Sequence, residues 1–144
     1  MPKFSPRSQK ILSTCHVDLR KVLADAIKST NFSVLSGKRG MAEQNELHRT
    51  GKSQLRWPNS MHCSEDDPEG LEDDSAAVDI GLYKASKGRV DWKDTEAWLV
   101  MQGHIERVAW DHQIGLRFGS NWDNDEDFDD ENFRDYGHIE LAVR

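Results

Sequence analysis

A single carboxylate interrupts an otherwise regular apolar pattern in the stretch SAAVDIGLY, residues 75–83. The alternation is typical of a half-buried strand, with apolar side chains at Val78, Ile80 and Leu82. A carboxylate on such a strand is costly to bury unless a cation, a metal ion or several hydrogen-bond donors meet it. Asp79 shares its face with the small residues Ala77 and Gly81, which leaves room above the carboxylate. The pattern therefore predicts a binding partner for Asp79.

Two histidines elsewhere in the chain can supply that partner through a metal ion. His138 alternates with Ile139 and Leu141, so its side chain is expected on the face opposite the apolar residues. His62 lies in NSMHCS, at the mouth of a long irregular segment. Two imidazoles and one carboxylate form a ligand set that catalytic zinc uses, with a fourth position open to water. Periodicity alone does not select this set, because four other histidines are present and are interpreted as surface residues: His16, His48, His104 and His112.

Helices and strands are predicted in an order that indicates one α+β domain over residues 1–144. Apolar spacing predicts helices at 8–29, 41–49 and 91–113, and strands within 31–37 and at 76–83, 116–118 and 138–143. A turn or hairpin is expected at 83–91, and residues 52–74 are expected to form one irregular segment. We therefore expect a small, mainly antiparallel sheet flanked by helices, without a separate wall-binding domain.

Composition and charge exclude several classes of function. A chain of 144 residues can bury a core without disulfides, and Cys15 and Cys63 are interpreted as thiols made in a reducing compartment. The net charge of −7 argues against a phosphate-binding surface, so no nucleic-acid partner is expected. No apolar run approaches the ~20 residues that span a bilayer, so membrane insertion is not expected. The N-terminal stretch lacks the apolar segment of a Sec-type signal peptide.

Three short motifs in sequence order resemble a known family of zinc peptidases. They are S-x-H at 60–62, A-x-D at 77–79 and D-x-x-H at 135–138. This set resembles the D-alanyl-D-alanine carboxypeptidase superfamily and, more narrowly, the L-alanyl-D-glutamate peptidases that serve tailed bacteriophages as endolysins. Further matches keep the family's order over residues 32–141: SGKRGMAEQNELHRTGKS, RVDWKD, LRFGSNWD and DYGHIEL. The resemblance implies the zinc D-Ala-D-Ala carboxypeptidase or Hedgehog-like fold.

The resemblance also implies a role for each matching residue. His62, Asp79 and His138 would hold one Zn²⁺, which lowers the pKa of a bound water and polarises the scissile carbonyl. Asp135 would be the catalytic carboxylate, taking a proton from water and passing it to the leaving amine. Arg39 matches the family arginine that faces the substrate, where it would stabilise the developing oxyanion or bind the D-Glu carboxylate. The sequence leaves both roles of Arg39 open.

Three neighbours of these residues have alternative interpretations. Glu140 shares a strand face with His138, so it is either a rival base, a partner that orients a histidine, or an ion-pairing residue. Ser60 would either bond the substrate or cap the loop that carries His62. Cys63 follows His62 directly, so in extended chain it is expected to face away from the metal.

The chain departs from the family pattern in two places. The usual spacing between the first histidine and the aspartate is short, whereas here an insert of about ten residues lies between them, which loop-closure entropy tolerates. We predict that residues 64–74 of this insert form a mobile acidic flap at the rim of the cleft. Gly40 follows Arg39 where the family usually has threonine.

An acidic stretch, DNDEDFDDEN at 123–132, suggests a second cation. Alternating carboxylates at Asp123, Asp125 and Asp127 suit Ca²⁺, although the spacing is not that of an EF-hand loop. A solvated acidic loop is the competing interpretation. Because the stretch leads into Asp135, a cation bound there would be placed to regulate the catalytic carboxylate.

These observations together predict a zinc-dependent peptidase that acts on peptidoglycan and cuts the L-Ala–D-Glu bond of its stem peptides. The expected protein is a monomer made in the host bacterial cytoplasm, which reaches the wall in the periplasm only after release. Two alternatives stay open: a D-alanyl-D-alanine carboxypeptidase with the same chemistry, and a non-catalytic metal-binding module that interacts with the wall.

Overall fold

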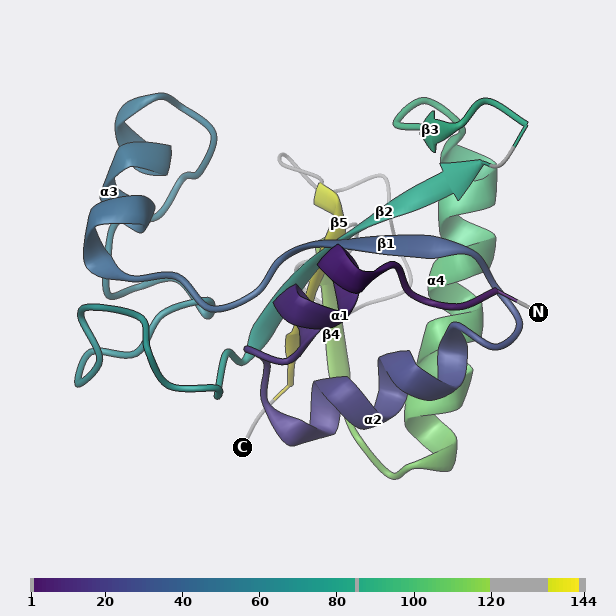
Figure 1. Cartoon of the computed structure of the whole chain (residues 1–144), viewed down its shortest axis with the longest axis horizontal. Helices are drawn as coiled ribbons and strands as arrows, with labels where there is room; N and C mark the ends of the chain where they lie inside the picture. The colour runs from purple at the N-terminus through teal and green to yellow at the C-terminus, as the bar shows by residue number, and fades with distance from the viewer. Residues whose placement is uncertain (1, 85, 120–134, 143–144) are drawn as a thin grey trace.

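The structure, a computed structural model, describes residues 2–84, 86–119 and 135–142, without the side chains of residues 135 and 136. The elements follow the predicted alternation of helices and strands (Figure 1). In chain order they are α1 (Pro6–Leu12), α2 (Val17–Ala26), β1 (Phe32–Ser36), α3 (Met41–Arg49), β2 (Ala77–Lys84), β3 (Arg89–Val90), α4 (Thr95–Asp111), β4 (Leu116–Gly119) and β5 (Asp135–Leu141). The predicted α+β class is confirmed.

The strands form one small antiparallel sheet in the order β1-β2-β5-β4, and β3 pairs with β2 in a hairpin, one of the two predicted possibilities for this segment. Within it, Asp79 of β2 lies directly opposite His138 of β5 and also pairs with Ser36 of β1. The central position of β2 therefore places Asp79 between two neighbouring strands, where residues from distant parts of the chain can reach it.

One face of the sheet packs against helices and forms the core. Val78, Ile80 and Leu82 are buried on that face, as their alternation predicted. Figure 1 shows α2 and α4 together on one side of the sheet, with α3 and the segment that follows it on the other side of the picture. The inner stripes of α2 and α4 are buried in this core: Leu19, Val22, Leu23, Ala26, Trp98, Met101, Ile105 and Ala109. Among the described residues, no helix has the length and apolar content to cross a membrane.

The predicted helix at 8–29 is wrong in one respect, because the chain leaves the helix between α1 and α2. The fully buried Cys15 forms an isolated β-bridge with Ser75, and the backbone N–H of His16 donates to the Ser75 carbonyl over 2.9 Å. Nδ1 of His16 then accepts from the N–H of Asp18 and caps α2. This pairing joins residues far apart in sequence, so helical periodicity does not reveal it.

Residues 64–74, predicted to be a mobile flap, make specific contacts with the segment after β1. The side chain of Lys38 is only 1% exposed, and its ammonium pairs with Asp67 at 3.2 Å and with Asp74. The same ammonium donates to Oγ of Ser64 over 2.8 Å. A flap without such contacts would be free to move, so the structure favours an anchored insert; its mobility in solution stays a prediction.

The insert also accounts for glycine at position 40. Gly40 is the N-cap residue of α3 and provides no side-chain cap. Instead, the carbonyl of Pro68 accepts a hydrogen bond from the first helical N–H, that of Met41, over 2.7 Å. A Cβ on Gly40 would lie 2.9 Å from the carbonyl oxygens of Pro68 and Glu69. The insert thus occupies the space of a capping side chain and satisfies one of the four N–H groups that the start of a helix leaves unpaired.

Candidate active site

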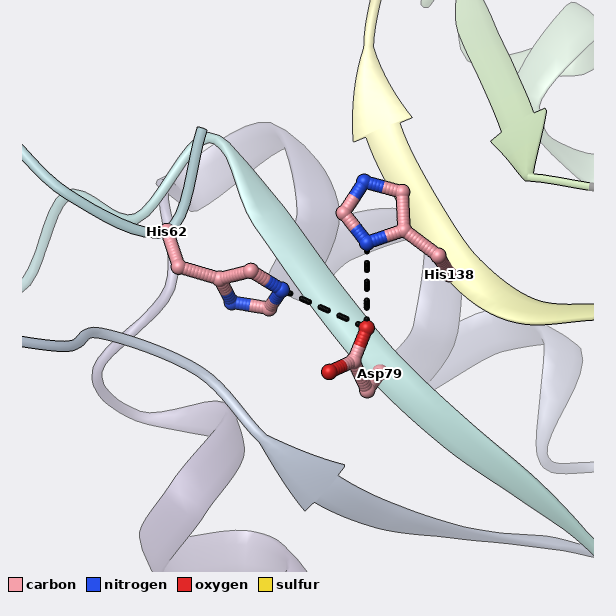
Figure 2. A group of neighbouring side chains, drawn as sticks. All are labelled: His62, Asp79 and His138. Carbon is pink, nitrogen blue, oxygen red and sulfur yellow. Dashed lines mark hydrogen bonds and ion pairs between the residues drawn. The ribbon is translucent and has the colours of Figure 1, made fainter. Parts of the chain in front are cut away.

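Three predicted metal ligands meet at one point beside the sheet. Figure 2 shows Asp79 on β2, His138 on β5 and His62 on the irregular segment, with both rings directed at the carboxylate. Oδ1 of Asp79 lies 3.3 Å from Nε2 of His62 and 3.1 Å from Nδ1 of His138. Each residue offers one ligand atom to a group in which all such atoms lie within 4.8 Å of one another. The described residues therefore include a buried group that can hold a metal ion.

A glycine allows strand β5 to approach β2 closely at this point. A Cβ on Gly137 would collide with the carbonyl oxygen of Ile80. The next residue is His138, whose Cα faces that of Asp79 across the two strands. The sequence Gly137–His138 thus combines close strand pairing with a ligand on the open face of the sheet.

The far nitrogen of each ring is fixed by an acceptor. Nδ1 of His62 donates to the Gly37 carbonyl over 2.7 Å, and Nε2 of His138 donates to Oε1 of Glu140 over 2.8 Å. These bonds select the neutral tautomer in which the other ring nitrogen, the one facing Asp79, carries a lone pair and no proton. Two lone pairs and a carboxylate directed at one point repel one another unless protons or a metal ion lie between them. The donor set therefore fits a divalent cation.

The electrostatics of these side chains show the same demand for positive charge. Burial alone would lower the pKa of His138, but hydrogen bonds to Asp79 and Glu140 outweigh it and raise the pKa to about 9. Burial alone would raise the pKa of Asp79, but hydrogen bonds from His138 and His62 outweigh it and hold that pKa well below its ordinary value. When no metal ion is bound, a proton on the His138 ring supplies the positive charge.

The spacing of the ligand atoms suits zinc. At Zn–N and Zn–O distances of ~2.1 Å, two ligands of a tetrahedral ion lie about 3.4 Å apart. The two distances from Oδ1 of Asp79, 3.1 and 3.3 Å, are close to that value. The two pairs that include Asp79 therefore have the spacing of ligands on a tetrahedral ion.

Arg39 holds the second oxygen of the aspartate. Its Nη2 donates to Oδ2 of Asp79 over 2.7 Å, its Nε to Oγ of Ser36 over 3.0 Å, and its Nη1 to Oε1 of Gln44 over 3.1 Å. Its backbone N–H donates to the carbonyl of His62 over 2.9 Å. Each side-chain nitrogen of Arg39 is thus committed to a protein acceptor, and the residue fixes two ligands at once.

The group opens into a cleft of about 410 Å³. Its charged lining comprises Arg39, Lys52, Asp79, Arg117 and Glu140 together with the two histidines, and its remaining lining residues are Ser53, Gln54, Leu55, Asn59, Ser60 and Met61. A buried metal-binding group beside a cleft of this size has the arrangement of an enzyme active site.

Comparisons with known proteins agree on one family. A family profile described as phage L-alanyl-D-glutamate peptidase matches residues 1–142. The chain belongs to this family of phage L-alanyl-D-glutamate peptidases. It is 32% identical to the L-alanyl-D-glutamate peptidase of Escherichia phage T5, over 97% of this chain and 98% of the relative. Its fold is similar to that of the Serratia marcescens L-Ala D-Glu endopeptidase ChiX, with a TM-score of 0.74 and 26% identity over 98% of this chain and 91% of that one.

Membership confirms the resemblance that the ordered motifs indicated, and it makes the chain a peptidase. In this L-alanyl-D-glutamate peptidase family member, the remaining predicted site residues fall into two groups. The structure describes the surroundings of Ser60, Glu140 and Cys63. It does not describe the side chain of Asp135, and Asp123, Asp125 and Asp127 lie outside the described residues.

Ser60 and Glu140 both support a histidine ligand. Oγ of Ser60 accepts from the N–H of His62 over 3.2 Å, which favours the interpretation that Ser60 caps the loop. Glu140 bonds His138 through Oε1, and its Oε2 accepts from Nη2 of Arg117 over 2.9 Å. Because both oxygens of Glu140 are engaged, its geometry favours orientation of the ring over proton transfer.

Cys63 is not among the residues that converge on the metal-binding group. Its Sγ contacts Oε1 of Gln44 at 3.9 Å. Burial raises the pKa of this thiol, which keeps it protonated and weakly reactive at neutral pH.

Sequence reasoning missed Gln44, the one buried residue of α3. Its Nε2 donates to Oγ of Ser53 over 2.9 Å and to the carbonyl of Leu55 over 2.7 Å, while its Oε1 accepts from Arg39. A signal was present, since a polar residue stands between Met41 and Leu47 at helical spacing, where an apolar one would normally pack.

Proposed function

We propose that this peptidase hydrolyses the L-Ala–D-Glu bond of peptidoglycan stem peptides with one zinc ion held by His62, Asp79 and His138. The observation that carries the proposal is the convergence of two imidazole lone pairs and one carboxylate oxygen, each fixed from behind by a protein group. Family membership supports the choice of substrate. In this interpretation the protein is an endolysin that lyses the host cell.

When bound, zinc would activate a water molecule and polarise the carbonyl of the scissile bond. Asp135 would accept the proton of the attacking water on its carboxylate and then donate it to the amine of D-Glu as that amine leaves. The backbone of Asp135 is opposite Gly119 at the start of β5, three residues before His138. The proposed base is therefore attached to the same strand as one metal ligand.

The other residues of the site would keep the ligands in place. Arg39 holds Oδ2 of Asp79, so that Oδ1 alone faces the metal. Glu140 holds Nε2 of His138, and the Gly37 carbonyl holds Nδ1 of His62, so each ring presents its other nitrogen. Supports of this kind fix the orientation and tautomer of the ligands and strengthen metal binding.

The decisive experiment combines metal analysis with product analysis. The purified protein is expected to contain one zinc per chain and to release peptides with a new N-terminal D-Glu from muropeptides, and a chelator should stop that release. Release of free D-Ala instead would establish the D-alanyl-D-alanine carboxypeptidase alternative. Zinc binding without hydrolysis of any muropeptide would favour the non-catalytic module.

The proposed base has its own test. Asp135→Ala should retain zinc and the fold and lose hydrolysis, because proton transfer is removed while the ligands stay intact. Hydrolysis at the wild-type rate by the zinc-loaded variant would refute the assignment of Asp135. The monomeric state, synthesis in the host cytoplasm and release to the wall remain proposals, as does calcium regulation through Asp123, Asp125 and Asp127.

A further inference from the structure

We propose that Lys52 determines specificity by binding the free α-carboxylate of the D-Glu residue at the scissile bond. The inference rests on the proposed function, because it names the substrate group that one cleft residue recognises. In stem peptides D-Glu is joined to the next residue through its γ-carboxyl group, so its α-carboxylate stays free. That carboxylate is attached to the same carbon as the scissile nitrogen, and it must therefore lie in the cleft beside the metal-binding group.

The cleft has three cationic side chains that could meet this carboxylate: Arg39, Lys52 and Arg117. Arg39 is paired with Asp79, and its other two side-chain nitrogens bond Ser36 and Gln44. Arg117 is paired with Glu140 at 2.9 Å. Lys52 is exposed at the cleft, and in the described part of the chain its ammonium forms no ion pair. Of the three cations, Lys52 is therefore the one whose charge no carboxylate of the described residues balances.

The turn after α3 fixes the backbone of Lys52. Gly51 adopts a left-handed conformation with φ of 80°, and its N–H donates to the carbonyl of His48 over 3.2 Å. The N–H of Lys52 donates to the carbonyl of Leu47 over 2.9 Å. This pair of bonds is the Schellman ending of a helix, which gives the following residue a defined direction.

A buried side chain continues that support along the cleft wall. Gln44, 0% exposed, bonds Oγ of Ser53 and the carbonyl of Leu55, and so holds the two residues that flank Gln54. The same side chain accepts from Arg39, which bonds Asp79. The wall that carries Lys52 is thus linked through Gln44 and Arg39 to a metal ligand, which fixes the backbone of the wall relative to the metal-binding group.

The charges of the cleft favour an anionic substrate group near Lys52. The carboxylates of Asp79 and Glu140 are both paired with arginines, at 2.7 and 2.9 Å. Because these carboxylates are paired, none of them balances the positive charge of Lys52. The cleft is thus locally positive at Lys52, although the whole chain carries a net charge of −7. An ammonium in a partly desolvated cleft binds a carboxylate more tightly than it binds the corresponding amide.

The test compares two synthetic stem peptides that differ only at this group: one with D-Glu and one with D-isoglutamine, in which the α-carboxylate is an amide. Wild-type, zinc-loaded protein should prefer the D-Glu peptide by about ten- to a hundredfold in kcat/KM, the value of one charged hydrogen bond, mainly through KM. Lys52→Gln should lose most of this preference by weakening the D-Glu reaction alone. Lys52→Arg should keep it in part, since arginine can still pair with a carboxylate.

Lys21→Gln is the matched control, because it removes the same charge from an exposed position on α2 outside the cleft. It should leave the rates of both peptides unchanged. Calorimetric binding of the product peptide with N-terminal D-Glu gives a readout without turnover, and it should weaken in Lys52→Gln but not in Lys21→Gln.

A full D-Glu preference in Lys52→Gln, an equal loss in Lys21→Gln, or a wild-type protein indifferent to the amide would each overturn the role of Lys52. Wild-type protein that cuts neither peptide would instead refute the proposed function. The two failures are therefore distinguishable.

Discussion

Arg39 and Asp79 form an ion pair in which Nη2 of the arginine meets Oδ2 of the aspartate at 2.7 Å. The pair joins the segment after β1 to the middle of β2 and leaves Oδ1 facing the two histidines. The arginine does not compete with a metal ion for the same oxygen. It limits the carboxylate to one ligand atom, as a four-coordinate site with an open position requires.

Arg39→Met should therefore weaken zinc binding. The variant leaves Oδ2 of a buried carboxylate without its charged donor, and loss of such a support typically lowers metal affinity by about 10–100-fold. Competition with a chromophoric chelator measures the affinity directly. The zinc affinity of Arg39→Lys should lie between those of the wild type and Arg39→Met, because one ammonium cannot replace a guanidinium that bonds three acceptors. Wild-type zinc affinity in Arg39→Met would show that the pair serves another purpose.

Glu140→Gln separates the two roles that the sequence left open for this residue. If Glu140 orients His138, the variant should bind zinc about tenfold more weakly, yet hydrolyse muropeptides once zinc is saturating. If Glu140 is the base, hydrolysis should be lost with zinc fully bound. We expect the first result, because both carboxylate oxygens of Glu140 are already engaged, by His138 and Arg117.

The sequence predicted most of the elements because their patterns are local. The alternation around Asp79 reflects one strand packing against the core, and the apolar spacing over 91–113 reflects one helix doing the same, so both elements were predicted correctly. The break near Cys15 was missed because it depends on a bridge to Ser75, sixty residues away. Local patterns do not contain such long-range pairings.

The candidate site also contains residues that local patterns indicate and residues that only the fold brings together. His62, Asp79 and His138 could be named because residue type and family motif both select them, and the structure brings them together. The helical spacing marked Gln44 as an unusual polar residue, but its role could not be predicted, since that role arises only when α3, the cleft wall and Arg39 are placed side by side. The contacts of residues 64–74 with Lys38 were not predicted for a similar reason, because the charge pattern did not reveal that the Lys38 side chain is buried.

Lys38→Met should destabilise the protein by about 1–3 kcal/mol, the typical cost of removing a charged partner from hydrogen-bonded groups. The variant removes the cation that Asp67 and Asp74 share. Urea denaturation measures the loss. Lys28→Met is the control, since Lys28 pairs with Asp25 on the surface at 3.7 Å, and it should cost less than about 1 kcal/mol.

Amide exchange tests the same anchoring site by site. The N–H groups of Leu71 and Glu72 donate to the carboxylate of Asp67. They should exchange slowly in the wild type and faster in Lys38→Met. Fast exchange throughout 64–74 in the wild type would support the mobile flap instead.

Gly40→Thr should destabilise the protein even though threonine suits the N-cap position of a helix. The new side chain would be forced against the carbonyls of Pro68 and Glu69, at a cost of about 1–3 kcal/mol. Replacing 65–72 with a short glycine linker should make the same substitution much less harmful, which a double-mutant cycle measures. Gly103→Thr is the control, because a Cβ there meets nothing within 4 Å. Strict additivity in the cycle would show that the insert and Gly40 are independent.

The network around Asp91 predicts how stability depends on pH. Its carboxylate accepts from the N–H of Lys93 and pairs with Lys87 and Lys84, and these contacts hold the pKa of Asp91 below its ordinary value. The folded protein therefore resists protonation of this group more than the unfolded chain does. The resulting stabilisation is complete above the unfolded pKa of about 3.9 and is lost as the pH falls towards the folded pKa.

Asp91→Asn should accordingly lower the melting temperature at pH 7, and the difference from wild type should shrink as the pH falls below about 4. Thermal denaturation of both proteins from pH 2 to 7 measures this. Asp111→Asn removes a carboxylate from an exposed pair with Arg107 at 3.5 Å, and it should change the melting temperature little at any pH. A difference between Asp91→Asn and wild type that persists undiminished in acid would show that packing, and not charge, makes Asp91 stabilising.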